Sequence, residues 1–150
     1  MATTQNKKVV EEWYSVKRAA YLSDMTTAMV NYLCRYDLVT PSIGSKRGRG
    51  TSRKYSYCDL VLLRVISKLL ANGISVLKLK KSLKALRGRS ANARSLLKER
   101  YVVTNGFDIY FQNESVIEML ESGQMVFAFV LELQKIREEV DISIREELSA

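Results

Sequence analysis

Apolar residues recur at helical spacing in four successive segments before residue 90, and each segment follows a hydroxyl residue suited to cap a helix. The pattern predicts helices over 16–22, over 26–36, from Ser56 through Leu70, and onward from Ser75. Ser23 and Asp24 favour a turn between the first two. Those two short helices should therefore lie across a tight corner, as in a helix-turn-helix.

The last third of the chain mixes strand and helix patterns. Asn105-Gly106 between two alternating runs predicts a type I′ β-hairpin over 101–112. A short helix is expected from Asn113 to Gly123, then a buried strand in the apolar run 125–133, then a last helix from about Gln134. On that last helix we expect Ile136, Val140 and Ile144 on the buried side and Glu138, Glu139, Glu146 and Glu147 facing solvent.

Between the second and third predicted helices lies a basic stretch, residues 42–56, with five Lys or Arg, three glycines and no acidic residue. Such a block buries too little apolar surface to order itself, so it is a solvated loop that is either idle or docked on an anionic partner. Pro41 ends the helical unit before it, because the residue preceding a proline avoids the α region. A basic loop suspended from helices in this way is the layout of a winged helix-turn-helix.

Charge is distributed unevenly along the chain. Residues 1–100 hold 21 Lys or Arg and 6 Asp or Glu, a net of +15, whereas residues 101–150 hold 3 and 10, a net of −7, which together give the +8 of the whole sequence. This division indicates two modules with different partners, the first of them a polyanion such as nucleic acid. The alternative is a solvated basic surface that has no partner.

Composition excludes several classes of function. With 47% hydrophobic and 27% charged residues the chain is ordinary for a soluble globular protein, and it has neither a signal-like start nor an apolar run of roughly 20 residues. We therefore expect a cytoplasmic protein. Since there is no histidine, and Cys34 and Cys58 stand alone, we expect no metal site, no cofactor and no enzymatic activity.

Five short stretches between Tyr14 and Leu83 follow the order and spacing of a known domain. They read YSV at 14–16, TTAMVNYL at 26–33, LVTP at 38–41, RKYSYCDL at 53–60 and NGIS at 72–75. This part, about half of the chain, resembles the DNA-binding domain of MerR-like transcriptional regulators. It departs from that pattern where the family's base-contacting arginine is Asn31 and its second tyrosine is Leu33. The resemblance implies the fold but no inherited operator sequence.

The resemblance also implies that helix 26–36 enters the major groove, with residues 42–56 as a wing along the flanking backbone. Asn31 could make a bidentate contact to adenine, and Thr26 or Thr27 could contact a phosphate or a thymine methyl. Tyr55 is either a phosphate donor or an anchor of the wing in the core. The remaining candidates are suited to phosphate, namely Lys17, Arg18, Tyr32, Arg35, Lys46, Arg47, Arg49, Arg53 and Lys54.

The expected fold class is mainly α with a small β part: a winged helix-turn-helix domain over 1–86, a basic linker over 87–100 and a small α+β module over 101–150. The linker is too short and polar for a coiled coil, so a homodimer on double-stranded DNA would use the 101–150 module, whose strand edges and apolar face a partner could cover. That module could equally be a lid on the core.

We interpret the chain as a sequence-specific DNA-binding transcriptional regulator. One alternative is an antitoxin-like or other interaction protein whose 101–150 module binds a protein partner. The other is a non-specific nucleic-acid-binding protein, which binds RNA or packages DNA. The run 78–100, with nine basic residues and one acid, could widen the DNA footprint, attract RNA or be a solvated helix face.

Overall fold

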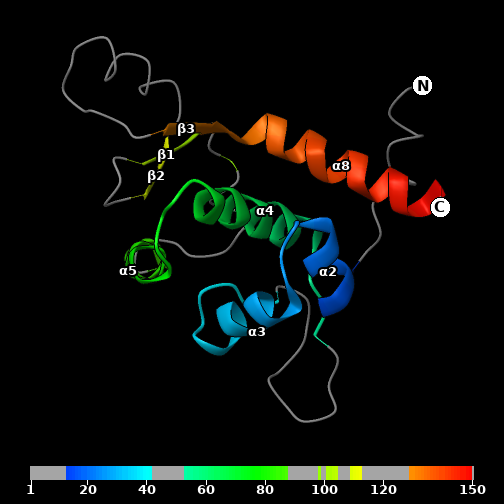
Figure 1. The fold of residues 1–150 in the computed structure, drawn as a ribbon, viewed down its shortest axis with the longest axis horizontal. Helices are drawn as coiled ribbons and strands as arrows, with labels where there is room; N and C mark the ends of the chain where they lie inside the picture. The colour runs from blue at the N-terminus through cyan, green and yellow to red at the C-terminus, as the bar shows by residue number, and fades with distance from the viewer. Residues whose placement is uncertain are drawn as a thin grey trace.

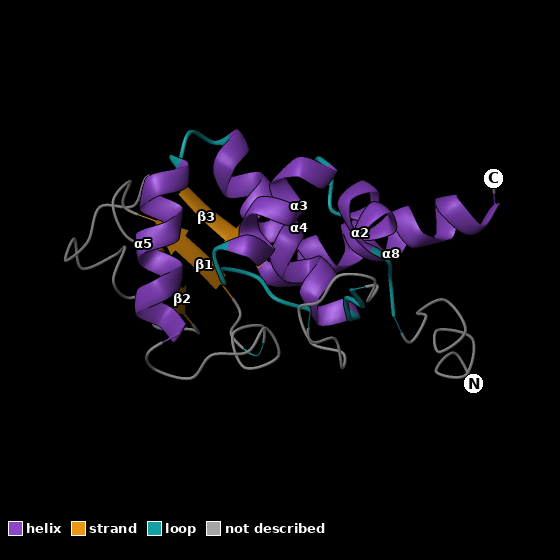
Figure 2. Ribbon diagram, turned by 90° about the horizontal axis from the view of Figure 1, so that it is seen from below, coloured by secondary structure: helices purple, strands orange, loops and turns teal. Residues whose placement is uncertain are grey.

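The computed structural model describes residues 13–41, 53–87, 98, 101–104, 109–112 and 129–149, which are mainly helical with one small sheet. The helices are α2 (Val16–Leu22), α3 (Thr27–Arg35), α4 (Tyr57–Ala71), α5 (Val76–Arg87) and α8 (Leu133–Ser149). The strands are β1 (Tyr101–Thr104), β2 (Ile109–Gln112) and β3 (Phe129–Glu132). In Figure 1 α4 lies between α3 and α8, and in Figure 2 α5 runs beside the sheet. The expected fold class is confirmed.

Four hydroxyl side chains cap the helices α2 to α5, as the sequence predicts. Each accepts a hydrogen bond from the backbone N–H three residues later, at 3.3, 3.1, 3.2 and 3.2 Å for Ser15, Thr26, Ser56 and Ser75. At the start of α4 the carboxylate of Asp59 also accepts from the backbone N–H of Ser56, at 2.9 Å, which completes a capping box. These bonds satisfy backbone donors that a helix cannot pair internally, so they fix where each helix begins.

The corner between α2 and α3 is held both locally and by α4. Asp24 has a φ of 57°, a left-handed conformation that aspartate tolerates better than most residues. The hydroxyl of the buried Ser23 donates to the carbonyl oxygen of Ala19 at 2.6 Å. From α4, the hydroxyl of Ser67 donates to the carbonyl oxygen of Asp24 at 2.8 Å. The predicted helix-turn-helix corner is confirmed, and α4 fixes it from behind.

A two-tyrosine bridge lies at the C-terminal end of the segment 42–56 that is predicted to be a wing. The backbone N–H of Tyr14 donates to the carbonyl of Tyr55 at 2.8 Å, and the reverse bond measures 2.9 Å. Both side chains are fully buried. The chain therefore enters α4 from a fixed point next to the start of α2, whatever course residues 42–52 take, which lie outside the described residues.

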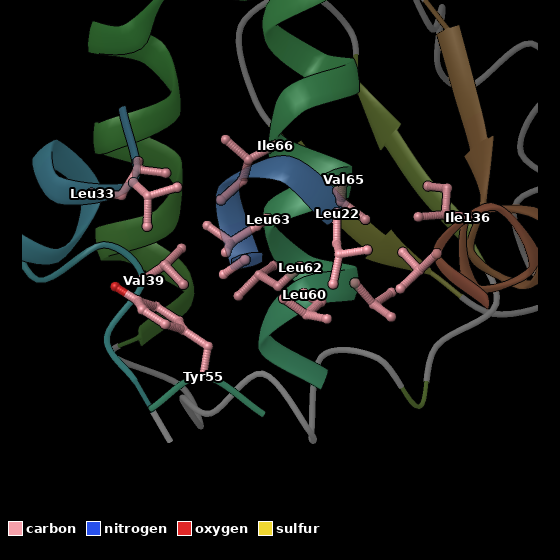
Figure 3. Packing of buried hydrophobic residues seen from close by; sticks show 14 of the residues in the cluster. Leu22, Leu33, Val39, Tyr55, Leu60, Leu62, Leu63, Val65, Ile66 and Ile136 are labelled. Carbon is pink, nitrogen blue, oxygen red and sulfur yellow. The ribbon is translucent and has the colours of Figure 1, made fainter. Parts of the chain in front are cut away.

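One hydrophobic core joins the first four helices to the C-terminal helix (Figure 3). Helix α4 is buried on several sides, with Leu60, Leu63 and Val65 fully covered. Leu33 of α3 and Ile136 of α8 approach it from different directions. Burial of one such side chain contributes roughly 1.5–3 kcal/mol, so this shared core, rather than helix propensity, holds the elements together.

The sheet has the order β2-β1-β3, with both pairs antiparallel. Tyr101 is opposite Gln112 in β2 and Glu132 in β3, so the hairpin strands predicted over 101–112 are confirmed. The predicted turn Asn105-Gly106 and the predicted helix from Asn113 to Gly123 lie outside the described residues.

The strand predicted over 125–133 is too long at its C-terminal end. Its residues 125–128 lie outside the described part, the strand ends at Glu132, and Leu133 is the first residue of α8. Leu133 is buried together with Ile136 and Val140, at the i, i+3, i+7 spacing of one helix face. A continuous apolar run cannot distinguish strand from helix, and here packing on α4 decides it.

Helix α8 docks its acidic side onto basic and hydroxyl groups of the first helices. Its buried side is the predicted one, Ile136, Val140 and Ile144. Two of the glutamates predicted to face solvent do not: Glu139 pairs with Lys68 at 2.9 Å and with Arg64 at 3.3 Å, and Glu147 pairs with Arg18. The apolar side of α8 is therefore covered within this chain.

Tyr57 gives this docking a dependence on pH. Its hydroxyl donates to the carboxylate of Asp141 at 2.7 Å, and burial first, then this hydrogen bond, raise the pKa of Tyr57 above its ordinary 10.0. A tyrosine with a raised pKa in the folded state contributes stability that is present below pH 10 and is lost as the pH rises beyond it.

Tyr57→Phe should lower the free energy of unfolding at pH 7 by about 1–2 kcal/mol, because Asp141 loses its donor. It should also flatten the loss of stability above pH 10, leaving the part due to the other tyrosines and to the lysines that titrate in the same range. Urea unfolding from pH 7 to 11 measures both effects. Tyr21→Phe, on the exposed side of α2, is the matched control and should change neither. An unchanged alkaline slope in Tyr57→Phe would contradict the assignment.

Candidate nucleic-acid interface

Helix α3 presents the face that the sequence predicts for DNA. Thr26, Thr27 and Arg35 are exposed, whereas Asn31 and Tyr32 are half-buried. The opposite side is anchored in the core by Val30, Leu33 and Cys34. Thr26 uses its side-chain oxygen to cap the helix, so its hydroxyl hydrogen remains as a donor toward a ligand. The helix is therefore held rigidly from behind and offers polar groups in front.

Arg53, at the base of the wing, reaches across to α3. One of its terminal nitrogens, Nη2, donates to the side-chain oxygen Oδ1 of Asn31, and Nη1 lies 3.5 Å from the hydroxyl of Tyr55. Burial acts to lower the pKa of Arg53, but a hydrogen bond to Cys34 and the proximity of Tyr55 outweigh it and raise that pKa. The guanidinium is thus a permanent charge fixed between wing and helix. This contact spans 22 residues of sequence, which is why the spacing of residues did not reveal it.

Tyr55 belongs to the core, one of the two roles left open for it. Its side chain is fully buried, and burial raises its pKa to about 12. A residue with no exposed surface has none to offer a phosphate. Its hydroxyl instead lies beside Arg53 and so contributes to holding the base of the wing.

The family follows from residues 14–86, which match the model of the MerR HTH family of regulatory proteins. These residues belong to the MerR family. Over 120 residues the chain is also 30% identical to uncharacterised HTH-type transcriptional regulators of Mycobacterium bovis and Mycobacterium tuberculosis. The match covers 79% of this chain but 52% of each relative, so the chain spans about half the length of those proteins. The matched family consists of HTH regulatory proteins, and the relatives are named as HTH-type transcriptional regulators.

Within the MerR domain, the two candidates at the start of α2 differ in their surroundings. Lys17 is exposed. The guanidinium of Arg18 bonds to the carboxylate of Glu147 through Nε at 2.8 Å and through Nη2, and it lies 5.2 Å from the ring centre of Tyr14. A phosphate would have to compete with Glu147 for Arg18, whereas Lys17 forms no ion pair within the described part of the chain.

An aromatic and basic cluster extends the MerR domain's exposed face, and sequence reasoning missed half of it. The rings of Tyr32 and Tyr36 lie 4.6 Å apart, and the amine of Lys80 from α5 lies 4.3 Å from the ring centre of Tyr36. Lys54 is placed similarly over Trp13, at 5.2 Å. The i, i+4 spacing of the two tyrosines was the available signal, but their neighbour Lys80 is brought in only by the fold.

Three predicted wing contacts, Lys46, Arg47 and Arg49, lie outside the described residues. In the part of the chain that is described, no cluster of three or more potential metal ligands occurs, and no helix is long and apolar enough to span a membrane. A shallow cleft between α4, the sheet and α8 is lined by Lys68, Glu139, Lys135 and Glu132. These charges pair with one another, at 2.9 and 3.9 Å, so they leave no net charge to select a ligand.

Proposed function

We propose that this protein is a sequence-specific DNA-binding regulator in which α3 enters the major groove while the wing, residues 42–56, lies along the adjacent backbone. The observation that carries the proposal is the bond between Arg53 and Asn31, because it joins the base of the wing to the exposed face of α3. An α-helix fits the major groove, and cationic groups beside it would hold the phosphates. The net charge of +15 over residues 1–100 supports a polyanion such as DNA as the partner.

The residues then take separate roles. Asn31 and Thr27 would face base edges. Tyr32, Arg35 and Lys17 would bind phosphates on one side of the groove, and the wing cations Lys46, Arg47, Arg49 and Lys54 would bind them on the other. Arg18 would contribute only after leaving Glu147.

A homodimer would read two half-sites of a pseudo-palindrome. Because α8 buries its apolar face inside the chain, we propose that the dimer uses an outer strand of the sheet, β2 or β3, whose backbone groups can pair with a second copy. The same burial disfavours the alternative of a protein partner seated on that face.

Selection from random double-stranded DNA, followed by binding measurements at several salt concentrations, tests the proposal. If ~5–8 phosphates are neutralised per protomer, the logarithm of the affinity should fall with the logarithm of salt with a slope of about −5 to −7. One motif should be enriched with wild-type protein, and Asn31→Ala should lose the base preference at the position of that motif which Asn31 faces. Steep salt dependence without any enriched motif would identify a non-specific binder instead, and a flat response would exclude DNA as the ligand.

A further inference from the structure

The side-chain amide of Asn31 already makes a hydrogen bond within the protein. Its oxygen, Oδ1, accepts from Nη2 of Arg53. In the described part of the chain its nitrogen, Nδ2, has no comparable bond, and the residue lies half-buried on the exposed face of α3. An asparagine amide has two lone pairs on its oxygen and two N–H donors on its nitrogen, and Arg53 takes one of the lone pairs, so what remains for a ligand is chiefly the donors.

This arrangement changes which base Asn31 can read. Bidentate recognition of adenine needs both halves of the amide, the oxygen for the N6 amino group and the nitrogen for N7. Guanine presents two acceptors, O6 and N7, at the same edge of the major groove. A side chain that offers chiefly donors pairs less well with the adenine amino group, but it satisfies guanine.

We propose that Asn31, held by Arg53, selects guanine rather than adenine at the base it faces, which rests on the proposed placement of α3 in the major groove. Arg53 is then a positioning residue, because it occupies the oxygen of Asn31 and adds its own N–H donors beside it. The sequence alone suggested that Asn31 contacts adenine, and the contact with Arg53 leads us to expect guanine instead.

Arg53 is placed to hold this state. Its guanidinium has Tyr55 as a second neighbour, 3.5 Å from its Nη1, and Cys34 as a third partner. Tyr55 is itself fixed in the core by the backbone bridge to Tyr14. A base edge that approaches α3 would therefore meet an amide already turned with its oxygen toward the wing.

Base analogues in the selected duplex test the inference directly. The position to change is the one whose base preference disappears in Asn31→Ala. Wild-type protein should bind guanine and hypoxanthine there equally, since both carry O6 and N7. Adenine should weaken binding roughly 5- to 150-fold, the range for loss of a bidentate contact, and 7-deazaguanine should also weaken it. Adenine or thymine binding as well as guanine overturns the inference while leaving the proposed function intact.

A second arm tests Arg53 itself. Arg53→Met keeps an apolar stem but frees the oxygen of Asn31, so the ratio of guanine to adenine affinity should fall at least tenfold or invert. Lys54→Met, next in the chain and directed to Trp13, should weaken both affinities by the same factor and leave that ratio unchanged. An unchanged ratio in a folded Arg53→Met overturns the positioning role. If Arg53→Met fails to fold, the analogue series on wild-type protein decides. Absence of any enriched motif refutes both this inference and the proposed function.

Discussion

Val140→Asp should lower the free energy of unfolding by about 3–5 kcal/mol, the largest effect we expect from a single change. Val140 is fully buried on the side of α8 that belongs to the common core. An aspartate there would place a charge among apolar side chains, and neither water nor a cation could reach it without opening the helix. Urea unfolding followed by circular dichroism measures the change.

The matched control is Ile142→Asp, two residues along the same helix, where the side chain is 51% exposed and a charge stays solvated. It should change the unfolding free energy by less than about 0.5 kcal/mol.

The same pair of variants also tests whether residues 1–86 and 101–150 are separate domains, a division that stays a prediction. If Val140→Asp releases α8 but leaves DNA binding and a second unfolding transition intact, the two parts fold independently. We expect one transition, with DNA binding lost alongside it.

Neutralising Lys46 and Arg49 together should have the largest effect on DNA affinity. Each phosphate contact adds about 0.9 to the steepness with which the logarithm of the affinity falls with the logarithm of the salt concentration. At 0.1 M salt, one contact therefore raises the affinity roughly eightfold relative to its contribution at 1 M. The double alanine variant should therefore lower the slope by about 2 and the affinity on the order of 50-fold. It should leave the selected motif unchanged, since contacts to the backbone carry no sequence information. Titrations at four salt concentrations measure both values.

A second pair of cations, distant from the wing, provides the control for this double variant. Lys135 and Arg145 are exposed on α8, across α4 from the proposed DNA-binding helix (Figure 1). Their double alanine variant removes the same charge from the protein but should lower the affinity only a few-fold. Equal losses in both pairs would mean that affinity follows net charge, and the wing would then have no role of its own.

The sequence was most informative where structure depends on neighbours a few residues apart. Ser15, Thr26, Ser56 and Ser75 each bond to the backbone three residues later, so their positions mark helix starts without reference to the rest of the fold. The hairpin strands of 101–112 are equally local. Where no such marker exists, as between β3 and α8, the predicted boundary was wrong by one residue, because Leu133 is apolar enough for either element.

That residues 42–56 form a wing beside α3 stays a prediction, since most of them lie outside the described residues. That Val30 and Leu33 of α3 are buried follows from the periodicity of that helix. That Arg53 occupies Asn31, and that Glu147 occupies Arg18, does not, since these contacts join residues 22 and 129 positions apart. Two side chains that the sequence assigned to DNA, Asn31 and Arg18, thus also have partners within the protein.

By itself, then, the sequence determined the helices, their caps, the corner between α2 and α3, and the basic character of the face beside the wing. All of these depend on local hydrogen bonding, periodicity or charge. Only the tertiary structure decided that α8 covers α4, that Tyr55 is buried, and that the side-chain oxygen of Asn31 accepts a hydrogen bond from Arg53. The physical reason is that burial and long-range hydrogen bonds depend on which surfaces pack against each other. The spacing of residues along the chain does not predict that packing.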